Sequence, residues 1–243
     1  PIVFVHGYGL STQMWSLIWQ KLQDKNYRLI AVDLRGHGGS TIGTAGIDST
    51  TMSADLAAVL ESLDVQNGVL VGHSTGGFLS LLMGLNHQKT AVSRLKHLVL
   101  LSTLCGGIGR ENPVLGVQVP LLKGGLMQPI LDSQTYGQAT TRPALGSMPS
   151  AAVAEATRRL MAQTNHEPLL PIVQALGREN YATRLGDFPL PCTIIHGTAD
   201  GTVVPLHAEE MAAHLPQVTV QMIPGGGHML NCERPFEVTQ QIK

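Results

Sequence analysis

The sequence is poor in cysteine, in charge and in long apolar runs, and each shortage excludes a class of protein. Its three cysteines, Cys105, Cys192 and Cys232, are odd in number and widely spaced, which argues against a disulfide framework and predicts reduced thiols in the core. Lysine and arginine nearly balance aspartate and glutamate, at 16 against 17, so no basic face is expected for nucleic acid or an anionic membrane. No apolar run approaches the roughly 20 residues that cross a bilayer, so no membrane span is expected.

What the chain does have is enough apolar residues for one sizeable core. At 243 residues and 43% hydrophobic content, it needs neither a disulfide nor a metal to fold, and we expect one catalytic domain with an insertion. The composition predicts a soluble, cytoplasmic protein. The chain starts at Pro1 without an initiator methionine, and its last predicted helix, from Arg234, ends abruptly. Both features leave open a removed signal peptide and clipped ends.

Short apolar runs alternate with helical patterns along most of the chain. Runs typical of buried strands lie at Ile2–Val5, Tyr27–Val32, Val69–Val71 and Leu98–Leu101. Between them, apolar residues recur at the spacing of one helical face, as in Met14–Leu22 and Met52–Leu63. This alternation predicts a parallel sheet covered by helices on both faces. Ligands of such sheets bind at the carboxyl ends of the strands.

A Gly-x-Ser-x-Gly sequence stands where one of these strands turns into a helix. The heptapeptide Val71–Gly77 follows a β-branched run and opens the apolar stretch Phe78–Leu85. A sharp, strained turn would push the hydroxyl of Ser74 out above the sheet, and glycines at Gly72 and Gly76 let neighbouring backbone pass closely. Ser74 is therefore the candidate nucleophile. A serine that only caps the following helix is the alternative, and the strand, turn and helix context weighs against it.

Two polar residues follow later strands to the same edge of the predicted sheet. Asp200 ends an HGTAD sequence after the apolar run Pro191–Ile195 and is the candidate acid. His228 ends a PGGGH sequence after the run Val218–Ile223 and is the candidate base. Its place after the last strand favours it over the other histidines. A turn-forming aspartate is the alternative for Asp200, and the motif outweighs it.

The chain carries HGYG at residues 6–9, DLRGHGGS at 33–40, GHSTGG at 72–77, HGTAD at 196–200 and GGGHML at 225–230. On these motifs it resembles the α/β-hydrolases over nearly its whole length, in particular serine esterases and lactonases with a Ser-Asp-His triad. The resemblance implies the α/β-hydrolase fold, a mostly parallel twisted sheet with flanking helices and an inserted helical cap. It also implies an oxyanion hole made by the backbone N–H groups of Tyr8 and Thr75.

The alternation of strands and helices stops between about residues 104 and 187 and resumes at Pro191. The first half of this segment is rich in glycine, proline and leucine, and its second half predicts helices at Pro149–Asn165 and Pro168–Leu176. We expect a cap over residues 104–187, inserted between core segments 1–103 and 188–243. Its aliphatic residues favour an apolar substrate, although packing of the cap on the core would explain any single one of them.

Other polar residues inside the motifs have structural interpretations. His6 and His73 lie beside the candidate site residues in sequence, but His73 precedes the nucleophile on the wrong side of the turn. We expect both to be structural. His37 and Asp33, in the DLRGHGGS sequence, are expected to stabilise their loop.

Neither a metal nor an organic cofactor is expected. His196, His207 and His214 show no close-paired ligand spacing. The sequence has no Walker motif, and Gly107-Ile-Gly109 is followed by Arg-Glu-Asn rather than by the pattern of a dinucleotide-binding loop.

Together these residues predict acyl transfer to water through a covalent intermediate. Ser74 would attack a carbonyl, His228 would take its proton, and Asp200 would orient the imidazole. The predicted activity is hydrolysis of a carboxylic ester or lactone of a small, largely apolar substrate. Two other reactions of the same triad stay open, namely carbon–carbon bond hydrolysis and cofactor-free perhydrolysis. A non-enzymatic small-molecule receptor of the same fold is a competitor of another class.

Overall fold

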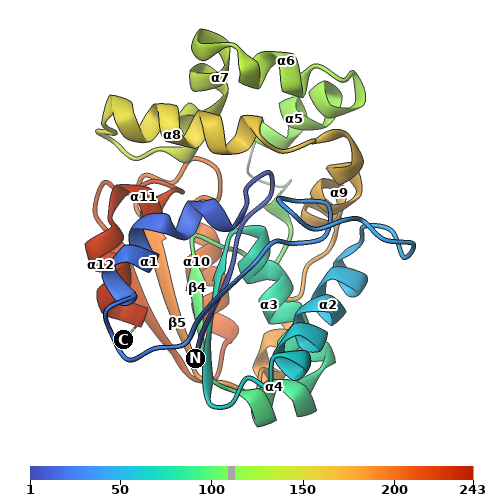
Figure 1. Ribbon diagram of the computed structural model, residues 1–243, viewed down its shortest axis with the longest axis vertical. Coiled ribbons are helices and arrows are strands. Elements are labelled where there is room, and N and C mark those ends of the chain that lie inside the picture. The colour runs from blue at the N-terminus through green and yellow to red at the C-terminus, as the bar shows by residue number, and fades with distance from the viewer. Residues whose placement is uncertain (109–112, 243) are drawn as a thin grey trace.

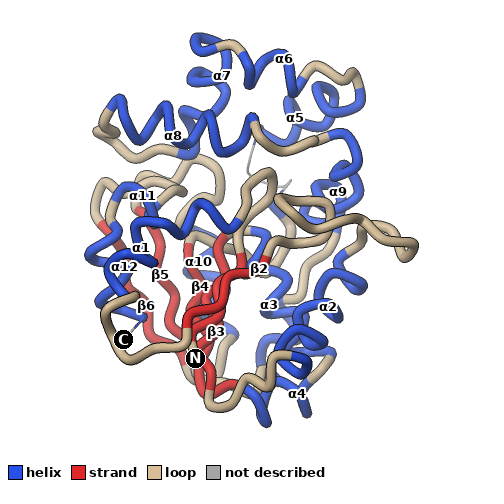
Figure 2. The backbone as a smooth tube through the Cα atoms, in the orientation of Figure 1, coloured by secondary structure: helices blue, strands red, loops and turns tan. Residues whose placement is uncertain are grey.

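The apolar runs form one sheet that is parallel throughout. The computed structural model describes residues 1–108 and 113–242. The strands are β1 (Ile2–Val5), β2 (Leu29–Val32), β3 (Gly68–His73), β4 (Leu95–Leu101), β5 (Cys192–Gly197) and β6 (Val218–Ile223). In the described part of the chain they form a 6-stranded sheet in the order β2-β1-β3-β4-β5-β6 (Figure 2). Every neighbouring pair is parallel, so the predicted parallel sheet is confirmed.

The predicted strand boundaries are wrong at four strands. β2 begins at Leu29 instead of Tyr27, whose side chain is 40% exposed in the preceding loop. β3 is longer than predicted at both ends. β4 begins three residues before the predicted Leu98, because the polar residues Lys96 and His97 interrupt its apolar pattern without ending the strand. β5 spans Cys192–Gly197 instead of the predicted Pro191–Ile195.

Helices cover both faces of the sheet, because alternate residues of each strand point to opposite sides. In β1, Ile2 and Phe4 pack on one side and Val3 and Val5 on the other. The first side is covered by α1 (Ser16–Leu22) and α12 (Pro235–Ile242). The second side is covered by α2 (Ser49–Ser62), α3 (Thr75–Asn86) and α10 (Leu206–His214). The short helices α4 (Gln88–Arg94) and α11 (Leu230–Glu233) complete the core.

The chain between β4 and β5 forms a helical layer above the carboxyl ends of the strands (Figure 1). Its helices are α5 (Pro113–Lys123), α6 (Met127–Asp132), α7 (Gln134–Thr141), α8 (Ala151–Ala162) and α9 (Leu170–Arg178). Residues 104–187 are called the insertion below. Its role as a cap, and the division into segments 1–103, 104–187 and 188–243, stay predictions.

The sequence analysis predicted α8 and α9 but not α5, α6 and α7. Proline at Pro120 inside α5 and Pro129 inside α6, and glycine at Gly137 inside α7, lower helix propensity and hide the pattern. Packing compensates, since Leu122 and Leu131 are buried in a separate small cluster of the insertion. The residues that follow Gly107-Ile108, including Gly109, lie outside the described residues.

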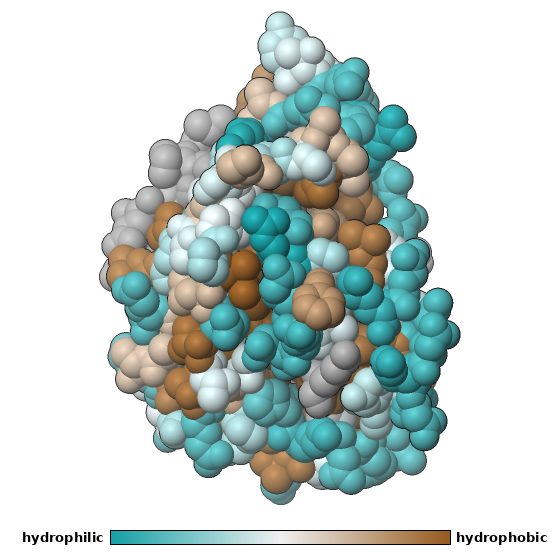
Figure 3. Space-filling model, turned by 90° about the vertical axis from the view of Figure 1, so that its left-hand side faces the viewer, coloured by the Kyte–Doolittle hydropathy of each residue, from teal (hydrophilic) through white to brown (hydrophobic). Residues whose placement is uncertain are grey.

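None of the helices in the described ranges is long and apolar enough to cross a bilayer. On the face shown in Figure 3, hydrophobic patches are small and separated by hydrophilic residues. Single exposed apolar side chains do occur on the insertion, such as Met148 and Tyr136, and such scattered residues are ordinary for a protein surface.

Candidate active site

Ser74 lies at a strained turn between β3 and α3. Its φ of 52° and ψ of −122° are those of the first central residue of a type II′ turn, where glycine is usual. Glycine neighbours make room for this turn. A Cβ on Gly72 would lie 2.6 Å from the Cα of Gly77, and one on Gly76 would lie 2.5 Å from the carbonyl oxygen of Val5. The turn places Ser74 directly before the N-terminus of α3, which favours negative charge.

His228 and Asp200 are joined by a hydrogen bond. Nδ1 of His228 lies 2.8 Å from Oδ2 of Asp200, and both side chains are buried. The other carboxylate oxygen of Asp200 accepts hydrogen bonds from the backbone N–H groups of Thr202 and Val203. Both carboxylate oxygens therefore act as acceptors, which assigns the proton of the imidazole to Nδ1 and leaves Nε2 of His228 able to accept one.

Two other histidines hold the loops that carry this pair. Nε2 of His196 donates to the carbonyl of Val203 at 2.8 Å and lies 3.5 Å from Oδ2 of Asp200. Nε2 of His73 donates to the carbonyl of His228 at 2.9 Å. Burial lowers the pKa of both His73 and His196, which keeps the two rings neutral. The sequence analysis took His73 as structural but missed this role of His196, whose place in the HGTAD sequence was the available signal.

A cavity of about 80 Å³ brings the predicted site residues together. Ser74, His228, Tyr8 and Thr75 line it, and Asp200 lies behind His228 with 3% of its surface exposed. The hydrogen bonds found among the described residues do not include one between Ser74 and His228. Such bonds are often long until substrate is bound.

The rest of the cavity wall is mostly apolar. Its apolar residues come from the core and the insertion and are Leu10, Ile108, Pro143, Ala144, Met161, Val173, Leu176 and Met229. Its further polar side chains are His73, Gln118, Thr140, Thr141 and Thr202. Among the described lining residues there is no lysine, arginine, aspartate or glutamate. The wall therefore suits a neutral ligand.

The backbone N–H groups of Tyr8 and Thr75 belong to segments that meet beside Ser74. Thr75 is the first residue of α3, where backbone N–H groups have no acceptor within the helix. The loop that carries Tyr8 passes very close, because a Cβ on Gly7 would lie only 3.0 Å from the Cβ of Ser74. The two segments can therefore direct N–H groups at an oxygen anion bound next to Ser74.

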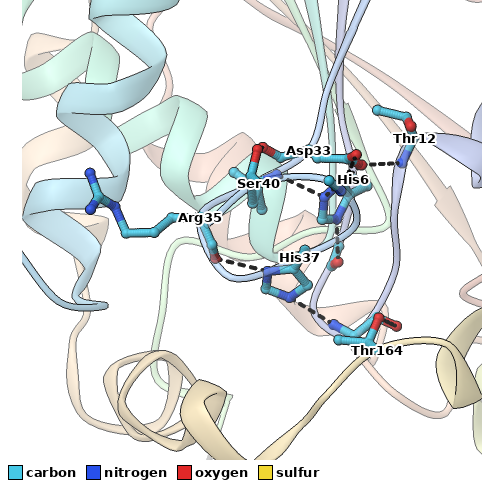
Figure 4. A network of polar contacts seen from close by, with 11 residues as sticks. His6, Thr12, Asp33, Arg35, His37, Ser40 and Thr164 are labelled. Atoms are coloured by element: carbon cyan, nitrogen blue, oxygen red, sulfur yellow. Dashed lines mark hydrogen bonds and ion pairs between the residues drawn. The ribbon is translucent and has the colours of Figure 1, made fainter. Parts of the chain in front are cut away.

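Two histidines hold the loop of residues 7–9 from the sheet side (Figure 4). His6 donates through Nδ1 to the carbonyl of Gly7 and accepts through Nε2 from the N–H of Leu34. His37 donates through Nδ1 to a backbone carbonyl and accepts through Nε2 from the N–H of Gly9 at 3.1 Å. Each ring must be neutral to accept, and burial lowers the pKa of His6 to about 3 and of His37 to about 4.

Asp33 connects its own loop to the chain just after the loop of residues 7–9. Its carboxylate accepts hydrogen bonds from the backbone N–H groups of Thr12 at 2.7 Å and Gly39 at 2.9 Å (Figure 4). These contacts lower the pKa of Asp33 and agree with the loop-stabilising role expected from the sequence.

The insertion also holds the acid and base loops, through contacts that the sequence analysis missed. The carbonyl of Ala144 accepts a hydrogen bond from the N–H of His228 at 3.0 Å. The carbonyl of the preceding Pro143 accepts one from the N–H of Gly201 in the acid loop, also at 3.0 Å. Backbone hydrogen bonds between distant segments leave no side-chain signal in the sequence, so nothing in the printed chain could have revealed them.

Comparisons with known proteins identify the family of the chain. Residues 1–235 match the family described as the alpha/beta hydrolase fold. A non-heme chloroperoxidase of Kitasatospora aureofaciens is 29% identical over 246 residues, which cover 94% of this chain and 84% of that protein. An esterase from Exiguobacterium antarcticum shares the fold at a TM-score of 0.87 and 21% identity, over 100% of this chain and 90% of its own. The enol-lactonase from Burkholderia xenovorans shares the fold at a TM-score of 0.83 and 19% identity, over 99% of this chain and 88% of its own. The chain therefore belongs to the α/β-hydrolase fold family.

Proposed function

We propose that this protein is a serine hydrolase that cleaves a carboxylic ester or lactone of a small, largely apolar substrate. The observation that carries the proposal is the 2.8 Å hydrogen bond between His228 and Asp200, beside a cavity that Ser74 also lines. The relatives support a hydrolase in general. Ester and lactone are the substrate classes named for the esterase and the enol-lactonase that share the fold.

In the first half of the reaction the acyl group moves to the protein. Nε2 of His228 takes the proton of Ser74 as its Oγ attacks the substrate carbonyl, and Asp200 stabilises the imidazolium. The N–H groups of Tyr8 and Thr75 hold the carbonyl oxygen as it becomes negative. Each such donor is worth on the order of 3 kcal/mol in the transition state. His228 then protonates the departing alcohol oxygen, and the acyl-enzyme remains.

In the second half water repeats the same steps. His228 takes a proton from a water molecule that attacks the acyl carbonyl, and the tetrahedral intermediate collapses with Ser74 as the leaving group. The carboxylic acid is released and Ser74 recovers its proton. A lactone follows the same course, except that its alcohol oxygen stays attached to the acyl chain.

The cavity favours short, neutral acyl groups. Its volume of about 80 Å³ is well below the roughly 300–1,000 Å³ of pockets that hold drug-sized ligands. Its wall is mostly apolar, through residues such as Leu10, Val173 and Met229. Burying an unpaired carboxylate there would be costly, so anionic substrates are disfavoured.

A second candidate is perhydrolysis, which the name of the chloroperoxidase relative favours. Here hydrogen peroxide replaces water as the nucleophile toward the acyl-enzyme at Ser74. The products are a peroxy acid and the free serine, and no electron is transferred in this step. The peroxy acid would then oxidise halide in solution and return to the carboxylic acid. The same triad serves both reactions, so they differ only in which nucleophile reaches the acyl group.

The test is hydrolysis of p-nitrophenyl esters from acetate to decanoate and of simple lactones, by the intact chain and by Ser74→Ala. We expect multiple turnover, fastest on the shortest esters, and a loss of at least about 10³-fold in Ser74→Ala. Adding hydrogen peroxide and assaying peroxy acid tests the second candidate.

Two outcomes would contradict the proposal. Turnover that survives in Ser74→Ala would remove the serine from the mechanism. Absence of turnover on every ester and lactone would favour the remaining alternatives, carbon–carbon bond hydrolysis or a receptor. A receptor would show slow or single-turnover hydrolysis.

A further inference from the structure

The loop of residues 7–9 is held from the insertion as well as from the sheet. Nδ1 of His166 lies 2.9 Å from the phenol oxygen of Tyr8, and Nε2 of the same ring lies 2.8 Å from the carbonyl oxygen of Met161. A carbonyl only accepts, so Nε2 carries the proton and Nδ1 accepts the phenol O–H. Two residues earlier, the hydroxyl of Thr164 donates to the carbonyl of Gly9 at 2.9 Å.

These contacts are shielded from water. His166 and Thr164 are 3% and 5% exposed. A Cβ on Gly9 would lie 2.7 Å from Cε1 of His166, so the ring rests directly on the backbone of the loop. Thr164 of the insertion and His37 of the core reach the same residue, Gly9, through its carbonyl and its N–H respectively.

The protonation states fit this arrangement. Burial lowers the pKa of His166, which keeps Nδ1 free to accept. Burial raises the pKa of Tyr8, which keeps its phenol protonated and able to donate. The ring of His37 lies 6.3 Å from the ring of Tyr8 between centroids, and burial lowers its pKa and keeps it neutral. The hydrogen bond from Tyr8 to His166 therefore has both partners in the required form.

We propose that His166 is a positioning residue of the oxyanion hole, assisted by Thr164, and that the insertion thereby helps the core to fix the direction of the Tyr8 N–H. The inference rests on the serine hydrolase function proposed above. An oxyanion donor acts only when it is aimed beforehand, and supporting residues must hold it within about 0.5 Å. The side chain of Tyr8 and the carbonyl of Gly9 both follow this N–H in the loop, so contacts to them hold the chain on the C-terminal side of the peptide that carries it. Because the insertion holds both groups, it positions the oxyanion donor in addition to lining the cavity.

A matched pair of substitutions at His166 tests the inference on p-nitrophenyl acetate. When the amide nitrogen of glutamine in His166→Gln replaces Nε2 toward Met161, no acceptor atom stands at the place of Nδ1. The amide oxygen of asparagine in His166→Asn lies near the place of Nδ1 and keeps that acceptor. We expect kcat to fall about tenfold in His166→Gln, less than when a donor is removed outright, with KM changed less than about twofold. His166→Asn should keep most of kcat.

Tyr8→Phe removes the other partner and provides a second route if His166→Gln folds poorly. It should lower kcat as much as His166→Gln, and the double variant should be no worse than either single one, because both remove the same hydrogen bond. Losses that multiply instead would contradict the pairing.

Ser150→Ala is the control for a merely structural effect. Ser150 caps α8 by accepting from the N–H of Val153 and lies in the same insertion, away from the cavity lining. Its loss should lower the thermal midpoint and leave kcat unchanged. An equal fall of kcat in Ser150→Ala, or an unchanged kcat in folded His166→Gln, would overturn the positioning role. If turnover survives in Ser74→Ala, the proposed function is overturned together with this inference. If turnover depends on Ser74 but His166→Gln is as active as the wild type, only this inference is overturned.

Discussion

The core and the insertion hold one candidate site by different means. In the core, Ser74 is fixed by backbone strain and by a turn in which Gly76 has no room for a Cβ. In the insertion, Ala144 and His166 contribute separate hydrogen bonds to the base loop and to the loop of Tyr8. A clash with rigid backbone prevents the turn from forming at all, whereas the loss of a single hydrogen bond costs only about 0.5–1.5 kcal/mol. The core therefore decides whether the site exists, and the insertion decides how well it is aligned.

The largest expected effect comes from adding one methyl group to the turn in the core. In Gly76→Ala the new Cβ would lie 2.5 Å from the carbonyl oxygens of Val5 and His6, and backbone cannot yield as a flexible side chain can. We expect a loss of more than about 4 kcal/mol, or no folded protein. Thermal unfolding followed by circular dichroism measures it.

Gly186→Ala is the matched control, because a Cβ at Gly186 meets no atom within 4 Å and its φ is negative. It should stay within about 0.5 kcal/mol of the wild type. A Gly76→Ala protein as stable as Gly186→Ala would show that the turn can relax, and the contrast between the two regions would then disappear.

The same contrast explains how much the sequence could predict. Strands such as β1 and β6 were predicted at both ends, because a continuous apolar run bounded by turn residues has few other interpretations. The candidate residues Ser74, Asp200 and His228 could be predicted because each stands at a fixed place after a strand. These signals are local in the sequence, and local signals are what a single chain displays.

The contacts of the insertion are not local. The partners Tyr8 and His166 are 158 residues apart, and neither stands in a pattern that points to the other. Pro120 and Gly137 hid helices that tertiary packing nevertheless stabilises. The sequence could therefore predict that an insertion follows residue 103, but not that it touches the loops of the site.

An intermediate effect is expected where the insertion meets the base loop. Glu233 is the last residue of α11, the helix that follows the loop of His228. Its Oε2 accepts a hydrogen bond from the N–H of Gly146 at 2.9 Å. Glu233→Ala leaves that buried N–H without this acceptor, which should cost about 1–3 kcal/mol and lower kcat by misaligning His228. Urea unfolding and ester hydrolysis measure the two losses.

Glu233→Gln separates the hydrogen bond from the charge. Burial raises the pKa of Glu233, so the site favours an uncharged side chain, and an amide oxygen can still accept from Gly146. We expect Glu233→Gln to keep nearly all of the stability and activity. If it were as damaging as Glu233→Ala, charge would hold the insertion at this point instead of a hydrogen bond.

A last effect is a change in pH dependence at Gly9, where the two regions meet. His37 holds this residue from the core and titrates, whereas Thr164 holds it from the insertion and does not. Burial lowers the pKa of His37 from 6.5 to about 4. The unfolded chain therefore binds the proton more readily, and the stabilising contribution of neutral His37 is complete above pH 6.5 and lost as the pH falls toward 4. The free energy of unfolding should fall over this range by up to about 1.4 kcal/mol per pH unit from His37 alone.

His37→Gln isolates this contribution, because its amide oxygen can accept the N–H of Gly9 without titrating. Other buried histidines, such as His6 and His73, also make the protein less stable in acid. The measurement is therefore the difference between the wild type and His37→Gln in the slope of unfolding free energy against pH. Urea unfolding at pH 6.5, 5.5 and 4.5 should give a shallower fall for His37→Gln. Parallel slopes would mean that the core does not hold Gly9 through a neutral His37. In that case the insertion, through Thr164, would contribute more than the core to holding the loop at Gly9, the opposite of what we infer for the rest of the site.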